Sequence, residues 1–139
     1  MQFSAMKADV TAIETAALVV NLYHGVQRPG GATGAVDAAL EGQISELIAD
    51  GEITGKPGEI TIVHTNGRLP ARRVVVVGLG KKQECTLETV RKAVGSVTQR
   101  LLRHRITRFH TILHGGGDLH DPATDGIDGL NGAERAIRT

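Results

Sequence analysis

Apolar residues along this chain fall into several runs that are typical of β-strands. Two runs, 16–23 and 72–80, are almost continuously apolar, as expected of strands that are covered on both faces. The second holds four consecutive valines, and it predicts the centre of a sheet. Ile60–His64 alternates apolar and polar residues like a half-covered strand. A final strand is expected over 108–114, and weak alternation over 1–8 indicates an edge strand.

Two helices are predicted between these strands. Apolar residues at helical spacing predict one helix over 34–50, with Gly51 placed to end it in a left-handed conformation. Thr86 is expected to cap a second helix that runs to about Arg103 and carries basic residues in its last turn. Its apolar stripe comprises Val90, Val94, Val97 and Leu101. Asn66-Gly67 marks a tight turn. Strands that alternate with helices favour an α/β layered sheet with some parallel pairing.

Length and composition indicate one small domain with an aliphatic core. The chain has 139 residues, two Phe, one Tyr and no Trp, which argues against a sugar or nucleobase site lined by aromatic rings. No signal peptide is recognisable at the N-terminus, and no apolar run approaches the ~20 residues that a membrane-spanning helix needs. We therefore expect a cytoplasmic protein without a membrane partner.

Charge is unevenly distributed although the net charge is only +1. Residues 1–67 contain three Lys/Arg and eight Asp/Glu, residues 68–108 contain eleven and two, and residues 109–139 contain two and five. A segment as basic as 68–108 could contact phosphate groups. The simpler expectation is that it pairs with the acidic segments on either side.

Glycine-rich turns raise the question of a phosphate site. Residues 78–82, Gly-Leu-Gly-Lys-Lys, follow a predicted strand and precede a predicted helix, where backbone N–H groups could cradle phosphate. The third glycine of the dinucleotide-binding fingerprint is missing. Residues 51–57 fail as a P-loop because the glycine spacing is one residue short and Pro57 replaces Ser/Thr. A tight strand-to-helix turn is the simpler interpretation of 78–82.

Histidines and aspartates near the C-terminus resemble a metal cluster. The candidate ligands are His110, His114, Asp118, His120 and Asp121. His110 and His114 would share one face of a strand, but their side chains would lie roughly 13 Å apart, too far to chelate one ion. A polar strand edge followed by a solvated loop is the simpler explanation.

The sequence assigns no catalytic group, cofactor-binding residue or metal ligand to this chain. Ser45 and Ser96 lie inside predicted helices and outside any G-x-S-x-G motif, and the carboxylates are scattered singly. Cys85 cannot form an internal disulfide or found a zinc site alone. It is expected to be a small residue near a helix start rather than a reactive thiol.

A family resemblance rests on the middle third of the chain. Residues 46–59, E-L-I-A-D-G-E-I-T-G-K-P-G-E, resemble the N-terminal domain of leucyl aminopeptidases, the cytosol aminopeptidase family, in which a helix ends in a G-E-x-x-G-K-x-G turn leading to a strand. Residues 72–81, R-R-V-V-V-V-G-L-G-K, match the next element of that family, a buried strand that ends in G-x-G-K. The helix expected after them occupies the corresponding place.

This resemblance implies a three-layer α/β/α mixed sheet of macro-domain-like fold over residues 1–114, with 115–139 as a loop or linker toward an absent catalytic domain. In the family, that C-terminal domain binds two divalent metals, zinc or manganese, removes N-terminal amino acids from peptides and assembles into hexamers. The N-terminal domains contribute to assembly, and in some bacterial members they help to bind DNA.

The family's catalytic signature, N-T-D-A-E-G-R-L, is absent, and residues 64–69 share only scattered letters with it and contain no carboxylate. The leading hypothesis is therefore a non-catalytic N-terminal domain that is inactive by itself. One alternative is a stand-alone macro-like module that binds ADP-ribose or another phosphate ligand. Another is binding of nucleic acid through the basic residues of 72–108, namely Arg72, Arg73, Lys81, Lys82, Arg100, Arg103, Arg105 and Arg108.

Overall fold

The computed structural model describes residues 9–112 of the chain. A short 3-10 turn at Val10–Ala12 leads into the first strand, and a second one, Lys82–Glu84, links the third strand to the last helix. The strands and longer helices follow in the order β1 (Leu18–Tyr23), α1 (Gly31–Ala39), α2 (Gln43–Ala49), β2 (Ile60–His64), β3 (Arg73–Gly80), α3 (Leu87–Arg103) and β4 (His110–Thr111).

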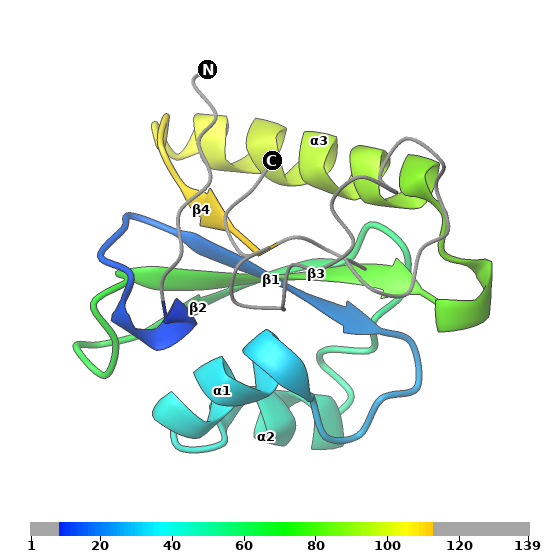
Figure 1. Cartoon of the computed structure of the whole chain (residues 1–139), viewed down its shortest axis with the longest axis horizontal. Coiled ribbons are helices and arrows are strands. Elements are labelled where there is room, and N and C mark those ends of the chain that lie inside the picture. The colour runs from blue at the N-terminus through cyan, green and yellow to red at the C-terminus, as the bar shows by residue number, and fades with distance from the viewer. Residues whose placement is uncertain (1–8, 113–139) are drawn as a thin grey trace.

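The four strands form a mixed sheet in the order β2-β3-β1-β4. β1 runs parallel to β3 and to β4, whereas β2 runs antiparallel to β3. The helices α1 and α2 cover one face of the sheet and α3 covers the other (Figure 1). The predicted three-layer arrangement with a mixed sheet is therefore confirmed.

β3 is the central strand because both of its faces are covered. Val74 and Val76 belong to the core beneath α1 and α2, while Val75 and Val77 belong to the core beneath α3. Successive side chains of a strand point to opposite faces, so a strand covered on both sides needs apolar residues at every position. The continuous valine run meets this requirement, and the predicted central position is confirmed.

The single helix predicted over 34–50 is wrong, because the structure contains two helices here. Glu41 and Gly42 adopt positive φ angles of 59° and 81°, which turn the chain between α1 and α2. The buried Asp37 carboxylate stabilises the second start: it accepts hydrogen bonds from the Ile44 N–H at 2.8 Å and from the Ser45 N–H at 3.1 Å. The apolar spacing continues across the break, so periodicity alone could not reveal it.

α3 begins as predicted at a Thr86 cap. The Thr86 hydroxyl accepts from the Thr89 N–H, and the Thr89 hydroxyl accepts in turn from the Thr86 N–H. Arg100 and Arg103 lie in the last turn, where positive charge interacts favourably with the helix dipole. The stripe that α3 buries consists of Ala93, Val97 and Leu101, while the predicted members Val90 and Val94 are half-buried. The helix is therefore rotated slightly from its expected orientation.

Several predictions fall outside the described residues. These are the edge strand over 1–8, the end of the last strand at 113–114, the domain boundary at 114 and the linker over 115–139. In the part of the chain that is described, no helix combines the length and the apolar character needed to span a membrane.

Candidate functional site

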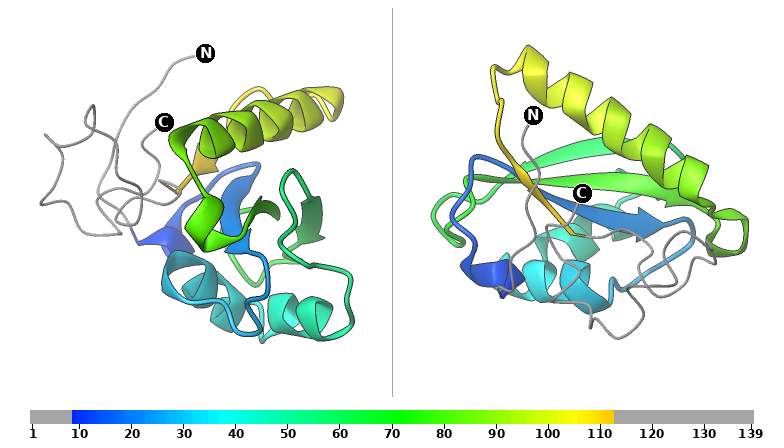
Figure 2. Two further views of the ribbon diagram at one scale, coloured as in Figure 1. Left: turned by 90° about the vertical axis from the view of Figure 1, so that its right-hand side faces the viewer. Right: turned by 45° about the horizontal axis from the view of Figure 1, so that its top comes forward.

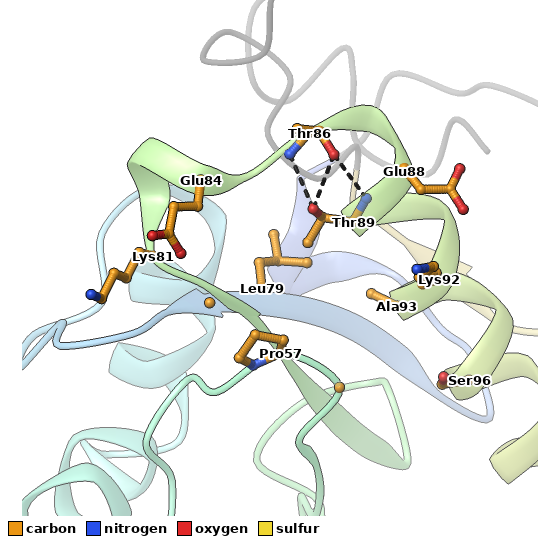
Figure 3. Close-up of a pocket in the computed structure, with 12 residues that line it drawn as sticks. Pro57, Leu79, Lys81, Glu84, Thr86, Glu88, Thr89, Lys92, Ala93 and Ser96 are labelled. Atoms are coloured by element: carbon orange, nitrogen blue, oxygen red, sulfur yellow. Dashed lines mark hydrogen bonds between the residues drawn. The ribbon is translucent and has the colours of Figure 1, made fainter.

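The carboxyl ends of the parallel strands β1 and β3 meet at one edge of the sheet, where open α/β sheets usually bind ligands. A pocket of about 460 Å³ lies here, between the end of β3 and the first turns of α3 (Figure 3). Its floor includes Leu79 and Pro57, and Lys81, Glu84 and Lys92 stand around it. Leu79 and Lys81 belong to the 78–82 turn that was considered for phosphate binding. Pro57, Glu84 and Lys92 were not predicted as site residues, because they come from separate segments of the chain.

The pocket is lined by groups of mixed character. The lining includes the hydroxyls of Thr86, Thr89 and Ser96 and charged groups of both signs. The complete lining consists of Pro57, Gly58, Leu79, Gly80, Lys81, Glu84, Thr86, Glu88, Thr89, Lys92, Ala93 and Ser96. The Thr86 and Thr89 side chains are already engaged in capping α3. The described lining therefore does not bring together a recognisable set of catalytic side chains.

The glycines of the G-x-G turn serve packing rather than phosphate binding. The Gly78 N–H donates to the Glu59 carbonyl and the Gly80 N–H donates to the Gly55 carbonyl, both at 2.8 Å. These amides have no free hydrogen to offer a phosphate, so the less favoured interpretation of 78–82 as a phosphate cradle is wrong at both glycines. A Cβ on Gly78 would lie 2.0 Å from the Lys56 carbonyl oxygen. Only glycine lets the 54–59 segment pass so close to β3.

The 54–59 segment is held in shape by one carboxylate. Glu59 accepts hydrogen bonds from the Thr54 N–H at 2.8 Å, the Gly55 N–H at 3.0 Å and the Thr54 hydroxyl at 2.7 Å. Burial by itself would raise the pKa of the Glu59 carboxyl, but these hydrogen bonds and the nearby Lys56 charge together lower that pKa below its ordinary value. The ionised form is therefore the one that fits the folded turn. The sequence argument recognised the turn but not this role.

Five of the ten basic residues of 72–108 lie on α3 or just beyond it. Arg91, Lys92, Arg100 and Arg103 are exposed on α3, and Arg105 is exposed just beyond it. Lys81 and Lys82 lie apart from the α3 C-terminal arginines, at the carboxyl end of β3, where the Lys82 ammonium stands 5.9 Å from the centre of the Tyr23 ring. The eight predicted nucleic-acid contacts therefore do not form one continuous patch.

For three arginines at the C-terminal end of α3, the expected pairing with the preceding acidic segment is wrong. The exposed carboxylates Glu41, Glu46, Asp50 and Glu52 lie on or beside α2, on the opposite face of the sheet from α3 (Figure 1). Within residues 9–112, no carboxylate forms an ion pair with Arg100, Arg103 or Arg105. The sheet lies between the carboxylates of the α2 region and these arginines.

The remaining candidate residues show no shared site. Of the residues that were considered as a metal cluster, only His110 is described. Burial, and next the Arg108 charge, lower the pKa of its imidazole. His114, Asp118, His120 and Asp121 lie outside the described residues. Cys85 directly precedes the Thr86 cap, as expected of a small residue at a helix start. Ser45 donates its hydroxyl to Asp37 within the fold, and Ser96 is exposed on α3.

Comparison with known proteins gives this fold a family. Residues 19–122 match the family described as the cytosol aminopeptidase family, N-terminal domain. The chain belongs to this family. Over 114 residues it is 37% identical to a probable cytosol aminopeptidase of Geobacter sulfurreducens, and this match covers 82% of this chain and 23% of that relative. A probable cytosol aminopeptidase of Geobacter sp. strain M21 is 44% identical over 77 residues, covering 55% of this chain and 16% of the relative.

This cytosol aminopeptidase N-terminal domain thus spans less than a quarter of the length of those relatives. Its fold is that of macrodomains. The macrodomain of Mycobacterium tuberculosis DarG superposes with a TM-score of 0.65 at 17% identity, covering 96% of this chain and 84% of that one. A Trypanosoma brucei macrodomain superposes with a TM-score of 0.64 at 18% identity, covering 80% of this chain and 45% of that one. At such identities the likeness establishes the fold alone.

Gly78→Ala should destabilise this domain by about 3 kcal/mol or more, because the new methyl group meets backbone that cannot move aside cheaply. Gly95→Ala is the matched control, since a Cβ there meets nothing within 4 Å on exposed α3. The control should gain about 0.5–1 kcal/mol from helix propensity. Urea unfolding monitored by circular dichroism measures both changes. Equal stability of the two variants would contradict the packing role of Gly78.

Glu59→Ala should cost about 1–2 kcal/mol at neutral pH, because two N–H groups and a hydroxyl lose their charged acceptor. A folded pKa below the ordinary value of 4.5 means that this stabilisation is complete above that pH and is lost as pH falls through the folded pKa. Urea unfolding of both proteins between pH 7 and pH 3 should therefore show the difference shrinking below about pH 4.5. The exposed neighbour Glu52 supplies a control variant, Glu52→Ala, expected to be neutral at both pH values.

Proposed function

We propose that this chain is the non-catalytic N-terminal domain of a metal-dependent aminopeptidase. Its role is to accompany a C-terminal catalytic domain and to contribute to the assembly of the enzyme, and a cytoplasmic location is part of this proposal. The observation that carries the proposal is the match over 114 residues to a relative of which those residues make up 23%. The remaining length of that relative has no counterpart in these 139 residues.

The metal chemistry of the proposed enzyme is assigned to the catalytic domain. A zinc or manganese site needs several His, Cys, Asp or Glu side chains grouped around one point. Residues 9–112 contain no group of three such side chains that could hold an ion. The described residues therefore do not fit a catalytic metal, and we derive no chemical step through one here.

We expect no hydrolysis of leucine p-nitroanilide by this chain alone, with or without zinc or manganese. The full-length Geobacter sulfurreducens relative is the positive control, and its matching segment alone should be as inactive as this chain. Colorimetric assays at equal molar concentrations provide the comparison. Metal-dependent turnover by this chain at a rate near that of the full-length relative would refute the assignment.

A second candidate function is binding of a polyanion such as DNA to the α3 layer. The supporting observation is that Arg100, Arg103 and Arg105 are exposed and form no ion pair with the described carboxylates. Unpaired cations on one face attract phosphate backbones through release of counterions, without regard to sequence. The described part of the chain has few aromatic rings to stack on bases, so the expected binding is electrostatic and unspecific.

Replacing both Arg100 and Arg103 with serine should weaken DNA binding uniformly across sequences. The slope of log affinity against log salt concentration should become shallower by about 2, if each arginine contacts one phosphate. Arg28→Ser is the matched control, because Arg28 is exposed between β1 and α1, away from α3. Fluorescence anisotropy with a labelled duplex at several salt concentrations gives these slopes. A salt-independent affinity for the unaltered chain would exclude this function.

A further inference from the structure

Strand β2 forms one border of the sheet. It pairs with β3 on one side, and no strand of the described residues pairs with its other side (Figure 2). A border strand presents unpaired N–H and C=O groups that can accept another strand.

The hydrogen-bond pattern shows which groups of β2 point outward. At the two ends of β2, the Gly78 N–H donates to the Glu59 carbonyl and the Thr65 N–H donates to the Arg72 carbonyl, so Glu59 and Thr65 bond toward β3. Residues of an antiparallel strand bond alternately to one side and the other. Thr61 and Val63 therefore also bond toward β3, and the N–H and C=O groups of Ile60, Ile62 and His64 point away from the sheet.

This border lacks the features that usually protect an edge strand. Natural edges carry lysines, prolines or inward-pointing charges that prevent pairing with another chain. Residues 60–64, Ile-Thr-Ile-Val-His, contain no Lys, Arg, Asp, Glu or Pro, and the first four are all β-branched. The net charge of +1 opposes self-association only weakly.

We propose that two copies of this chain pair through β2, antiparallel and centred on Ile62. In this register Ile62 lies opposite the Ile62 of the second copy, and Ile60 lies opposite His64. Each outward N–H then meets an outward C=O. Registers centred on Thr61 or Val63 would leave some of these outward groups within β2 without a counterpart, so the Ile62-centred register satisfies the edge most completely.

The side chains suit the same arrangement. Ile60 and Ile62 are half-buried and pack at the border of the core beneath α3. In the paired sheet, these isoleucines would cover each other on the α3 face, and Thr61 would lie opposite Val63 on the other face. Pairs of β-branched residues across neighbouring strands stabilise sheets. A second copy is the occupant that this strand fits, because its own sequence supplies every partner residue.

Sedimentation equilibrium of the 139-residue chain tests the proposal. We expect a reversible dimer at micromolar to sub-millimolar concentrations. Ile62→Pro should raise the dimer dissociation constant about tenfold or more, because it removes one outward N–H on each copy and blocks approach. It spares the bonds to β3, so circular dichroism should remain unchanged. Ile62→Val keeps the N–H and should stay dimeric. A chain that is monomeric throughout would overturn the proposal.

Disulfide trapping tests the register in a Cys85→Ser background, and it does not depend on the proline variant. Ile62→Cys should cross-link under mild oxidation, because Cα atoms of directly opposed residues lie about 5.5 Å apart, within disulfide reach. Ile60→Cys is the matched control, since its counterpart would lie roughly 13 Å away along the strand. Equal cross-linking of both variants, or cross-linking of Ile60→Cys alone, would overturn the register. Neither experiment involves peptidase activity, so its outcome is independent of the proposed function.

Discussion

The structure depends on covering β3 on both faces and at its carboxyl end. Its valines fill two separate cores. Near its end, Gly78 lies against the backbone of Gly55 and Lys56, and Gly80 lies against the Pro57 ring. The valine positions need a side chain, whereas Gly78 and Gly80 leave no room for one, and Leu79 between them packs in the core beneath α3. The Glu59 carboxylate completes the arrangement, because it fixes the segment that closes over the glycines.

Much of the fold could be predicted from the sequence, because the decisive residues act locally. Thr86 caps α3 through contacts three residues away, and the continuous valine run of β3 reflects two covered faces. The break between α1 and α2 could not be predicted in this way. It depends on Asp37 accepting hydrogen bonds from residues seven and eight positions ahead, while the apolar spacing runs on without interruption. Periodicity reports which face of a helix is buried, not whether the helix is continuous.

The candidate site shows a different limit of sequence reasoning. A glycine-rich turn between a strand and a helix has the same letters whether its amides bind phosphate or another loop. The choice is made by Gly55 and Glu59, which are distant in sequence and supply the carbonyls that Gly80 and Gly78 bond. The placement of the charges is likewise not evident from the local sequence. The exposed carboxylates of α2 and the exposed arginines of α3 lie on opposite faces, because the sheet lies between the two helices.

The layered arrangement also shows which groups remain available for contacts with other molecules. The two cores bury the apolar side chains of both layers, and two of the hydroxyls that line the pocket, those of Thr86 and Thr89, are used to cap α3. Within the described residues, two features at the periphery remain exposed. They are the charged outer face of α3 and the open backbone edge of β2. A charged face suits electrostatic contact with a polyanion, and an open backbone edge suits pairing with another strand.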